Sequence, residues 1–77
     1  RLRCENRIMD QMIDIFGTEM KILKRDDESF ITSVLVNKQG VLFLAQQFME
    51  AIEIIEPDNL RETMKEQLKL TLQKYSR

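Results

Sequence analysis

The chain of 77 residues is long enough for one domain with a single core and too short for two. Apolar residues make up 43% of it and charged residues 32%, a balance that is typical of a folded protein and excludes a disordered charged tail. The net charge of −1 creates no overall field that would attract nucleic acid or anionic lipid, and no apolar run approaches the ~20 residues needed to span a bilayer.

Two features of the sequence bear on the setting of the protein. Cys4 is the only cysteine and cannot form an internal disulfide, so we expect a reducing, intracellular compartment, either cytoplasmic or nuclear. The chain begins with Arg1 rather than Met. We therefore expect residues 1–77 to be a single helical domain taken from a longer protein.

Apolar residues at spacings of three and four predict a long first helix over residues 3–24. The seam along this helix consists of Leu2, Met9, Ile13, Phe16, Met20 and Leu23. Gly17 lies inside the pattern, and a glycine in a helix interior costs up to ~1 kcal/mol. Because the seam continues in register beyond it, we expect one helix with a kink at Gly17.

The second element is predicted to be a short helix over residues 27–37. It follows the run Lys24–Ser29, which changes from basic to acidic side chains and so predicts a turn between two helices. The run Phe30–Val36 is rich in β-branched residues, as strands are, but we find no second strand-like segment to pair with it. A polar stretch then leads to Gly40, which we expect to cap the helix.

The same periodicity predicts two further helices, over residues 41–55 and 59–75. Glu56–Asn59 interrupts the pattern, and Asn59 with Glu62 has the spacing of a capping box at the start of the last helix. Because the connections are short, we predict an all-α protein, a compact up-and-down bundle of four helices. The expected core face of the last helix consists of Leu60, Met64, Leu68, Leu72 and Tyr75.

The composition argues against a catalytic role. There is no histidine, which removes the commonest general base and the commonest metal ligand. The only two glycines, Gly17 and Gly40, cannot build a phosphate-cradling loop, and the acidic cluster Asp26–Glu28 lacks the alternation and the glycine of a calcium loop. We therefore predict a protein that is not an enzyme and that has no cofactor or metal site.

Apolar residues outside the expected core predict a surface that binds a partner. Phe43 and Ile54 align through Gln47 and Glu50 on the far side of the third predicted helix, and Leu70 points away from the core of the fourth. Either the bundle buries these residues, or they dock a partner peptide, a partner helix or a second copy of the chain. We predict an adaptor-like protein–protein interaction module, with homodimerisation as the nearest alternative.

A basic stripe on the last helix offers a second kind of partner. Arg61, Lys65 and Lys69 recur every four residues and could hold the phosphates of a peptide or a nucleic acid. Glu62 and Glu66 run beside them, however, as on many solvated helix surfaces, and no aromatic residue is interleaved. Nucleic acid is therefore the alternative partner that fits less well, and a membrane is not expected.

Overall fold

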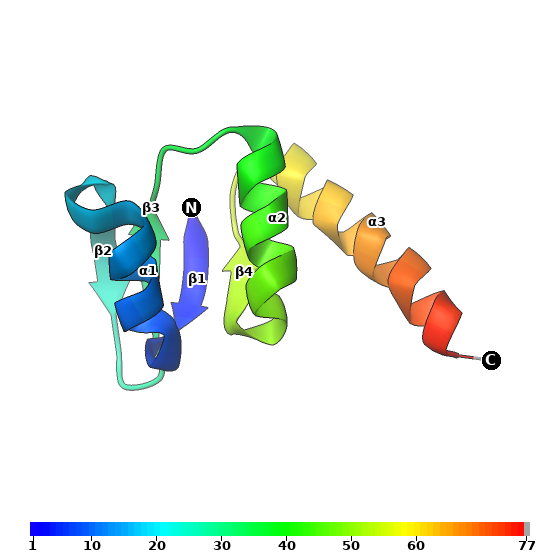
Figure 1. The fold of residues 1–77 in the computed structure, drawn as a ribbon, viewed down its shortest axis with the longest axis horizontal. Coiled ribbons are helices and arrows are strands. Elements are labelled where there is room, and N and C mark those ends of the chain that lie inside the picture. Colours follow the sequence, from blue (N-terminus) through cyan, green and yellow to red (C-terminus); the bar gives the residue numbers. More distant parts are fainter. Residues whose placement is uncertain (77) are drawn as a thin grey trace.

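The fold is a four-stranded antiparallel sheet with two helices on one face and a third helix that extends away from one edge (Figure 1). The computed structural model describes residues 1–76. In chain order its elements are β1 (Leu2–Glu5), α1 (Met9–Phe16), β2 (Lys21–Arg25), β3 (Ser29–Ser33), α2 (Lys38–Phe48), β4 (Ile52–Ile54) and α3 (Asp58–Tyr75). Of the helices in this part of the chain, none combines the length and the apolarity that crossing a membrane takes.

The strands are ordered β2-β3-β1-β4, and each neighbouring pair is antiparallel. The units β1-α1-β2 and β3-α2-β4 interleave, so that each pair of strands encloses one strand of the other unit. This is the split β-α-β arrangement, here followed by α3. Its consequence for the surface is that β2 and β4 are the two edges of the sheet.

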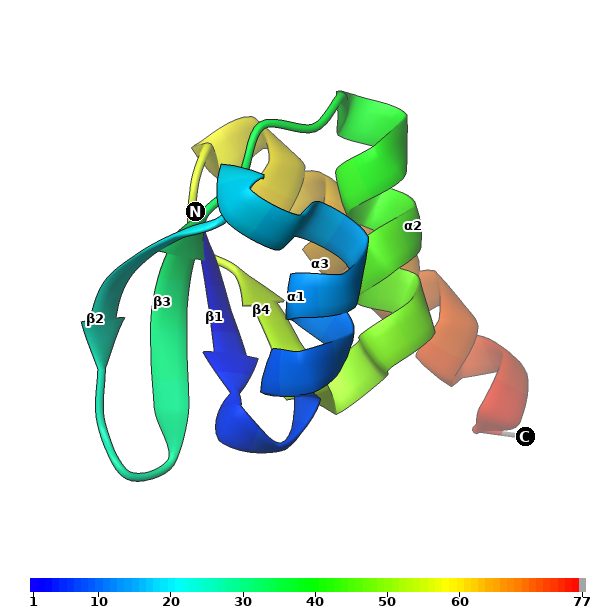
Figure 2. The same cartoon turned by 60° about the vertical axis from the view of Figure 1, so that its left-hand side comes forward.

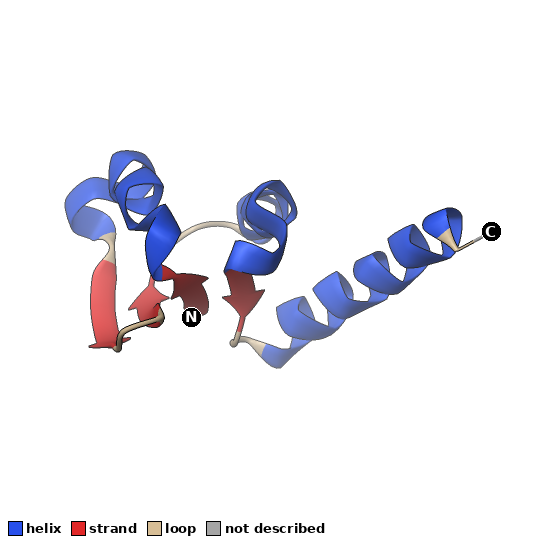
Figure 3. Cartoon of the chain, turned by 90° about the horizontal axis from the view of Figure 1, so that it is seen from below, coloured by secondary structure: helices blue, strands red, loops and turns tan. Residues whose placement is uncertain are grey.

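The core lies between the sheet and the helices α1 and α2, which cover the same face (Figure 2). Alternate residues of β1, β3 and β4 are buried, as expected for strands with one covered face. The view along the sheet shows the two layers and the course of α3 away from them (Figure 3). The buried apolar residues are Leu2, Cys4, Ile8, Met12, Phe30, Val41, Leu44, Ala45, Ala51, Ile52, Ile54 and Met64.

The all-α four-helix bundle that the sequence predicts is wrong. Residues 3–24 contain β1, α1 and β2 rather than one helix, and residues 27–37 contain β3. Residues 41–55 begin as a helix but end as β4, so only the last predicted helix, over residues 59–75, coincides with an observed one. The strand-like run beginning at Phe30 does have partners, because it pairs with β1 and β2.

Helix ends account for much of this error. Gly17 has a φ of +57°, in the left-handed region that favours glycine, and its N–H bonds to the carbonyl of Ile13 to end α1. The predicted helix ran through this position. Gly40, predicted to end a helix, instead lies in the first turn of α2, where its N–H donates to Oδ1 of Asn37 at 2.7 Å.

A turn does lie within Lys24–Ser29, but it joins β2 to β3 instead of joining two helices. Asp26 organises it, because its Oδ1 accepts hydrogen bonds from the backbone N–H groups of Glu28 and Ser29, both at 2.8 Å. These bonds hold the pKa of Asp26 below its ordinary value. The β2–β3 hairpin is therefore closed by an aspartate that caps its turn.

Candidate functional site

A groove with a cavity volume of about 550 Å³ lies between α3 on one side and the end of α2 and the strand β4 on the other. We call it the β4–α3 groove. Its floor is apolar and buried, and consists of Ala45, Ile52, Ile54 and Met64. The bank along α3 consists of Arg61, Lys65, Leu68, Lys69 and Leu72. A concave, mostly apolar surface of this volume is typical of ligand sites in proteins.

The groove is open because α3 packs on the domain along its first half, as far as Gln67, whose Oε1 accepts a hydrogen bond from Nε2 of Gln46 at 2.6 Å. Leu60 is half-buried and Met64 is buried, whereas Leu68 is 44% exposed and Leu72 is 65% exposed. From there α3 diverges from α2 (Figure 1). The residues predicted to form the core face of this helix do share one face, but from Leu68 onward the side chains of that face are exposed.

The main chain of β4 presents a free edge to this groove. β4 pairs with β1 on one side, and in residues 1–76 no strand lies on its other side. The N–H of Ile55 donates to the carbonyl of Arg1, the residue before β1. In an antiparallel ladder only alternate residues bond to a given neighbour, so Glu53 is the residue of β4 that bonds to β1. Ile52 and Ile54 therefore direct their main-chain groups to the other, outer side of β4.

Two contacts on the outer side agree with this assignment. The N–H of Ile52 donates to the carbonyl of Met49, and Nη1 of Arg61 donates to the carbonyl of Ile54 at 3.0 Å. The outward groups that remain are the carbonyl of Ile52 and the N–H of Ile54. They lie two residues apart on the edge, as the groups that bond an added strand do.

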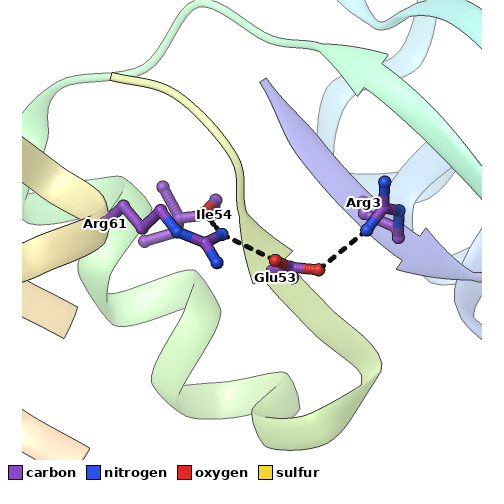
Figure 4. Close-up of polar contacts among 4 residues, drawn as sticks. All are labelled: Arg3, Glu53, Ile54 and Arg61. Atoms are coloured by element: carbon purple, nitrogen blue, oxygen red, sulfur yellow. Dashed lines mark hydrogen bonds and ion pairs between the residues drawn. The ribbon is translucent and has the colours of Figure 1, made fainter. Parts of the chain in front are cut away.

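Glu53 links β1, β4 and α3 through two arginines (Figure 4). Its Oε1 lies 3.1 Å from Nη1 of Arg3, and its Oε2 lies 2.6 Å from Nη1 of Arg61. The hydrogen bond from Arg61, followed by the charges of both arginines, holds the pKa of Glu53 below its ordinary value. Arg61 therefore anchors the start of α3 against β4, and its guanidinium is already engaged within the protein.

The charge on the groove is uneven. Its two carboxylates are paired, since Glu53 binds the two arginines and Glu50 lies 3.5 Å from Nη2 of Arg7. Lys65 and Lys69 are exposed, and neither takes part in an ion pair among residues 1–76. The charged side chains of the groove lining that have no ion pair are thus positive and lie on the α3 bank.

The residues predicted to bind a partner do not form one surface. Ile54 is 4% exposed and Glu50 lies on the rim, so both line the groove, but Phe43 and Gln47 lie outside it on α2. Their predicted alignment fails because α2 ends at Phe48 and Ile54 belongs to a strand. Leu70 lines a second hollow of about 440 Å³ between α2 and α3.

The predicted phosphate-binding residues do line one surface, the α3 bank of the groove. Of the three, Lys65 and Lys69 make no ion pair with an acidic side chain among residues 1–76, whereas Arg61 holds Glu53 and the carbonyl of Ile54. Sequence reasoning missed the other seven residues that line the groove, including Glu53 and the two leucines Leu68 and Leu72, which it assigned to the core. The length of the apolar face of α3 could have revealed the two leucines, because it runs for more turns than a domain this small can cover.

The described residues carry little reactive chemistry. Within residues 1–76 no three His, Cys, Asp or Glu side chains gather as metal ligands would. Cys4 is buried in β1, and burial raises its pKa to about 11, so the unreactive thiol form predominates at neutral pH. Comparison of the chain with protein-family models, curated proteins and solved structures gives no match.

Proposed function

We propose that this domain is a protein–protein interaction module that holds an apolar segment of a partner polypeptide in the β4–α3 groove and acts by binding, without catalysis. The observation that carries the proposal is the pair of exposed leucines, Leu68 and Leu72, beside a buried apolar floor. An exposed apolar surface with charges at its rim is typical of protein-binding sites. In keeping with a single unpaired cysteine, we place this activity inside the cell.

The two leucines have enough apolar surface to matter for affinity. Full burial of a leucine side chain contributes about 1.5–3 kcal/mol, and Leu68 and Leu72 are each about half exposed or more. A partner that covers both therefore gains on the order of 1–3 kcal/mol from them alone, before it contacts the floor of the groove. Loss of either leucine should weaken binding measurably.

A selection from a displayed library of random peptides about ten residues long tests the proposal. Peptides enriched on the wild-type domain are measured against two variants, Leu68→Glu in the groove and Leu35→Glu in the exposed segment between β3 and α2. We expect unchanged affinity for Leu35→Glu. For Leu68→Glu we expect a loss of about tenfold or more, because a carboxylate would have to be desolvated in the groove.

Two results would count against the proposal. One is a selection that enriches no peptide for the wild-type domain. The other is a set of peptides that bind both variants as well as the wild type, which would place their site elsewhere. Circular dichroism of each variant confirms that the fold is retained, as expected since both leucines are exposed.

Self-association is a second candidate function, and the projecting half of α3 favours it. Leu68, Leu72 and Tyr75 follow one another at helical spacing and are all exposed, Tyr75 at 84%. Two such helices could cover one another across a symmetric interface. Sedimentation at two protein concentrations separates the candidates, because a mass that stays at one chain eliminates self-association.

A further inference from the structure

We propose that the partner segment is an extended peptide of alternating apolar and acidic residues, which adds to the free edge of β4 as a fifth strand. This inference rests on the function proposed above, since it specifies what fills the β4–α3 groove and in which conformation. Three features carry it: the outward main-chain groups of β4, the space beside them, and the unpaired lysines on the facing bank.

The main-chain groups of β4 select an extended partner over a helical one. The carbonyl of Ile52 and the N–H of Ile54 face the groove, and an extended chain can bond both of them at once. A helix has already used its own main-chain groups internally, so it would leave both groups without partners. Covering them in that way would add a desolvation cost that strand addition avoids.

The groove is long enough for a short strand. Its α3 bank runs from Arg61 to Leu72, which at ~1.5 Å per helical residue is ~16 Å, the span of about five extended residues at ~3.3 Å each. The contact of Arg61 with the carbonyl of Ile54 limits the ladder at one end. The added strand therefore bonds at Ile52 and Ile54 and contacts α3 with its side chains beyond them.

The charge of the groove selects an acidic peptide. Lys65 and Lys69 have no ion pair among residues 1–76, whereas both carboxylates of the groove are already paired. Because successive side chains of a strand point to opposite sides, acidic residues can alternate with the apolar residues that meet Leu68 and the floor. A second copy fits less well, since pairing two β4 edges would bring the lysines of both chains into one interface.

The test uses a capped synthetic peptide of about seven residues in which valine alternates with glutamate. We expect it to bind the wild-type domain, and to lose about tenfold or more in affinity against the double variant Lys65→Glu, Lys69→Glu. The double variant Lys21→Glu, Lys38→Glu, which reverses two exposed lysines outside the groove, is the matched control and should bind as the wild type does. A peptide with lysine in place of glutamate should bind at least about tenfold more weakly.

Two measurements report the conformation of the bound peptide. Hydrogen exchange of the Ile54 amide should slow by about tenfold or more when the peptide is bound. Two N-methylated peptides are compared, one methylated at the odd-numbered residues and one at the even-numbered residues. One of these two phases should lose binding and the other should bind nearly as the unmodified peptide does, because only alternate N–H groups of a strand bond to a given neighbour.

The possible outcomes separate this inference from the proposed function. If library peptides bind at Leu68 but Ile54 exchange does not slow, or both N-methylated phases bind equally, strand addition is wrong and the interaction module stands. If the alternating peptide does not bind, or binds the lysine-reversed variant equally well, the acidic-strand inference is overturned. A concentration-dependent mass that Leu68→Glu abolishes would assign the groove to a second copy instead.

Discussion

Two apolar residues, Ile54 and Phe43, should differ sharply in what they contribute to stability. The side chain of Ile54 is 4% exposed on β4, whereas that of Phe43 is 68% exposed on α2. Truncation of a buried isoleucine to alanine costs about 2–5 kcal/mol, from lost burial and from the cavity left behind. Truncation of an exposed phenylalanine should change the free energy of unfolding by no more than about 0.5 kcal/mol.

These values are large against the total stability of the domain. A protein of this size has a free energy of unfolding of roughly 4–12 kcal/mol, so Ile54→Ala removes a major share of it. At 4–8 °C per kcal/mol, the Tm should fall by at least about 8 °C for Ile54→Ala and by at most about 4 °C for Phe43→Ala. Ile54→Val, expected to cost about 0.5–1.5 kcal/mol, keeps the series measurable if the alanine variant unfolds.

Urea and thermal denaturation followed by circular dichroism provide the measurement. In a helical bundle with both residues on one exposed stripe, the two alanine variants would behave alike. Equal losses for Ile54→Ala and Phe43→Ala would therefore refute the placement of Ile54 in the core beneath the groove. A Phe43→Ser, Ile54→Ser double variant is unsuitable for mapping a partner surface, because its second substitution should unfold the domain.

Three further predictions concern single residues. Gly17→Ala should destabilise the domain by about 1–3 kcal/mol, because φ is +57° at this position. In a continuous helix the same substitution would stabilise the protein, so a rise in Tm would contradict the observed helix end. The pKa of Glu53 is lowered in the folded state, so its contribution to stability is present above the ordinary value of 4.5 and is lost as pH falls through the lowered pKa. From pH 7 to pH 3 the urea midpoint should therefore drop more for the wild type than for Glu53→Gln. Parallel curves for the two proteins would show that the pairing with Arg61 contributes nothing to stability. Because Cys4 is buried and its pKa is raised to about 11, iodoacetamide at pH 8 should label it only in urea; rapid labelling of the folded chain would mean that β1 is not held in the sheet.

The sequence supports the placement of α3 and the helical character of residues in α1 and α2, but it does not reveal the strands or the ends of those two helices. The long run of helix formers after Pro57 has a periodicity that only a helix explains, and the structure confirms it as α3. Leu2–Glu5 and Ile52–Ile54 are so short that their alternation of apolar and polar residues also fits a helical pattern. Without them, the strand at Phe30 has no apparent partner, which is why the bundle was predicted.

The candidate site was accessible to sequence reasoning only in part. The spacing of Arg61, Lys65 and Lys69 on one helix face is a local property, and the structure does place all three on the groove. Whether Leu68 is covered depends on where α3 diverges from the sheet, which is a tertiary property that periodicity does not encode. The same holds for Ile54, whose burial follows from pairing with a strand 52 residues earlier in the chain.

Amide hydrogen exchange at β4 in the unliganded domain tests the free edge most directly. Glu53 bonds to β1, whereas the N–H of Ile54 faces the groove. We predict slow exchange at Glu53 and fast exchange at its neighbour Ile54, with no partner present. Equal protection of both amides would show that the outer side of β4 is already occupied, and the groove would then have no edge to which a strand could add.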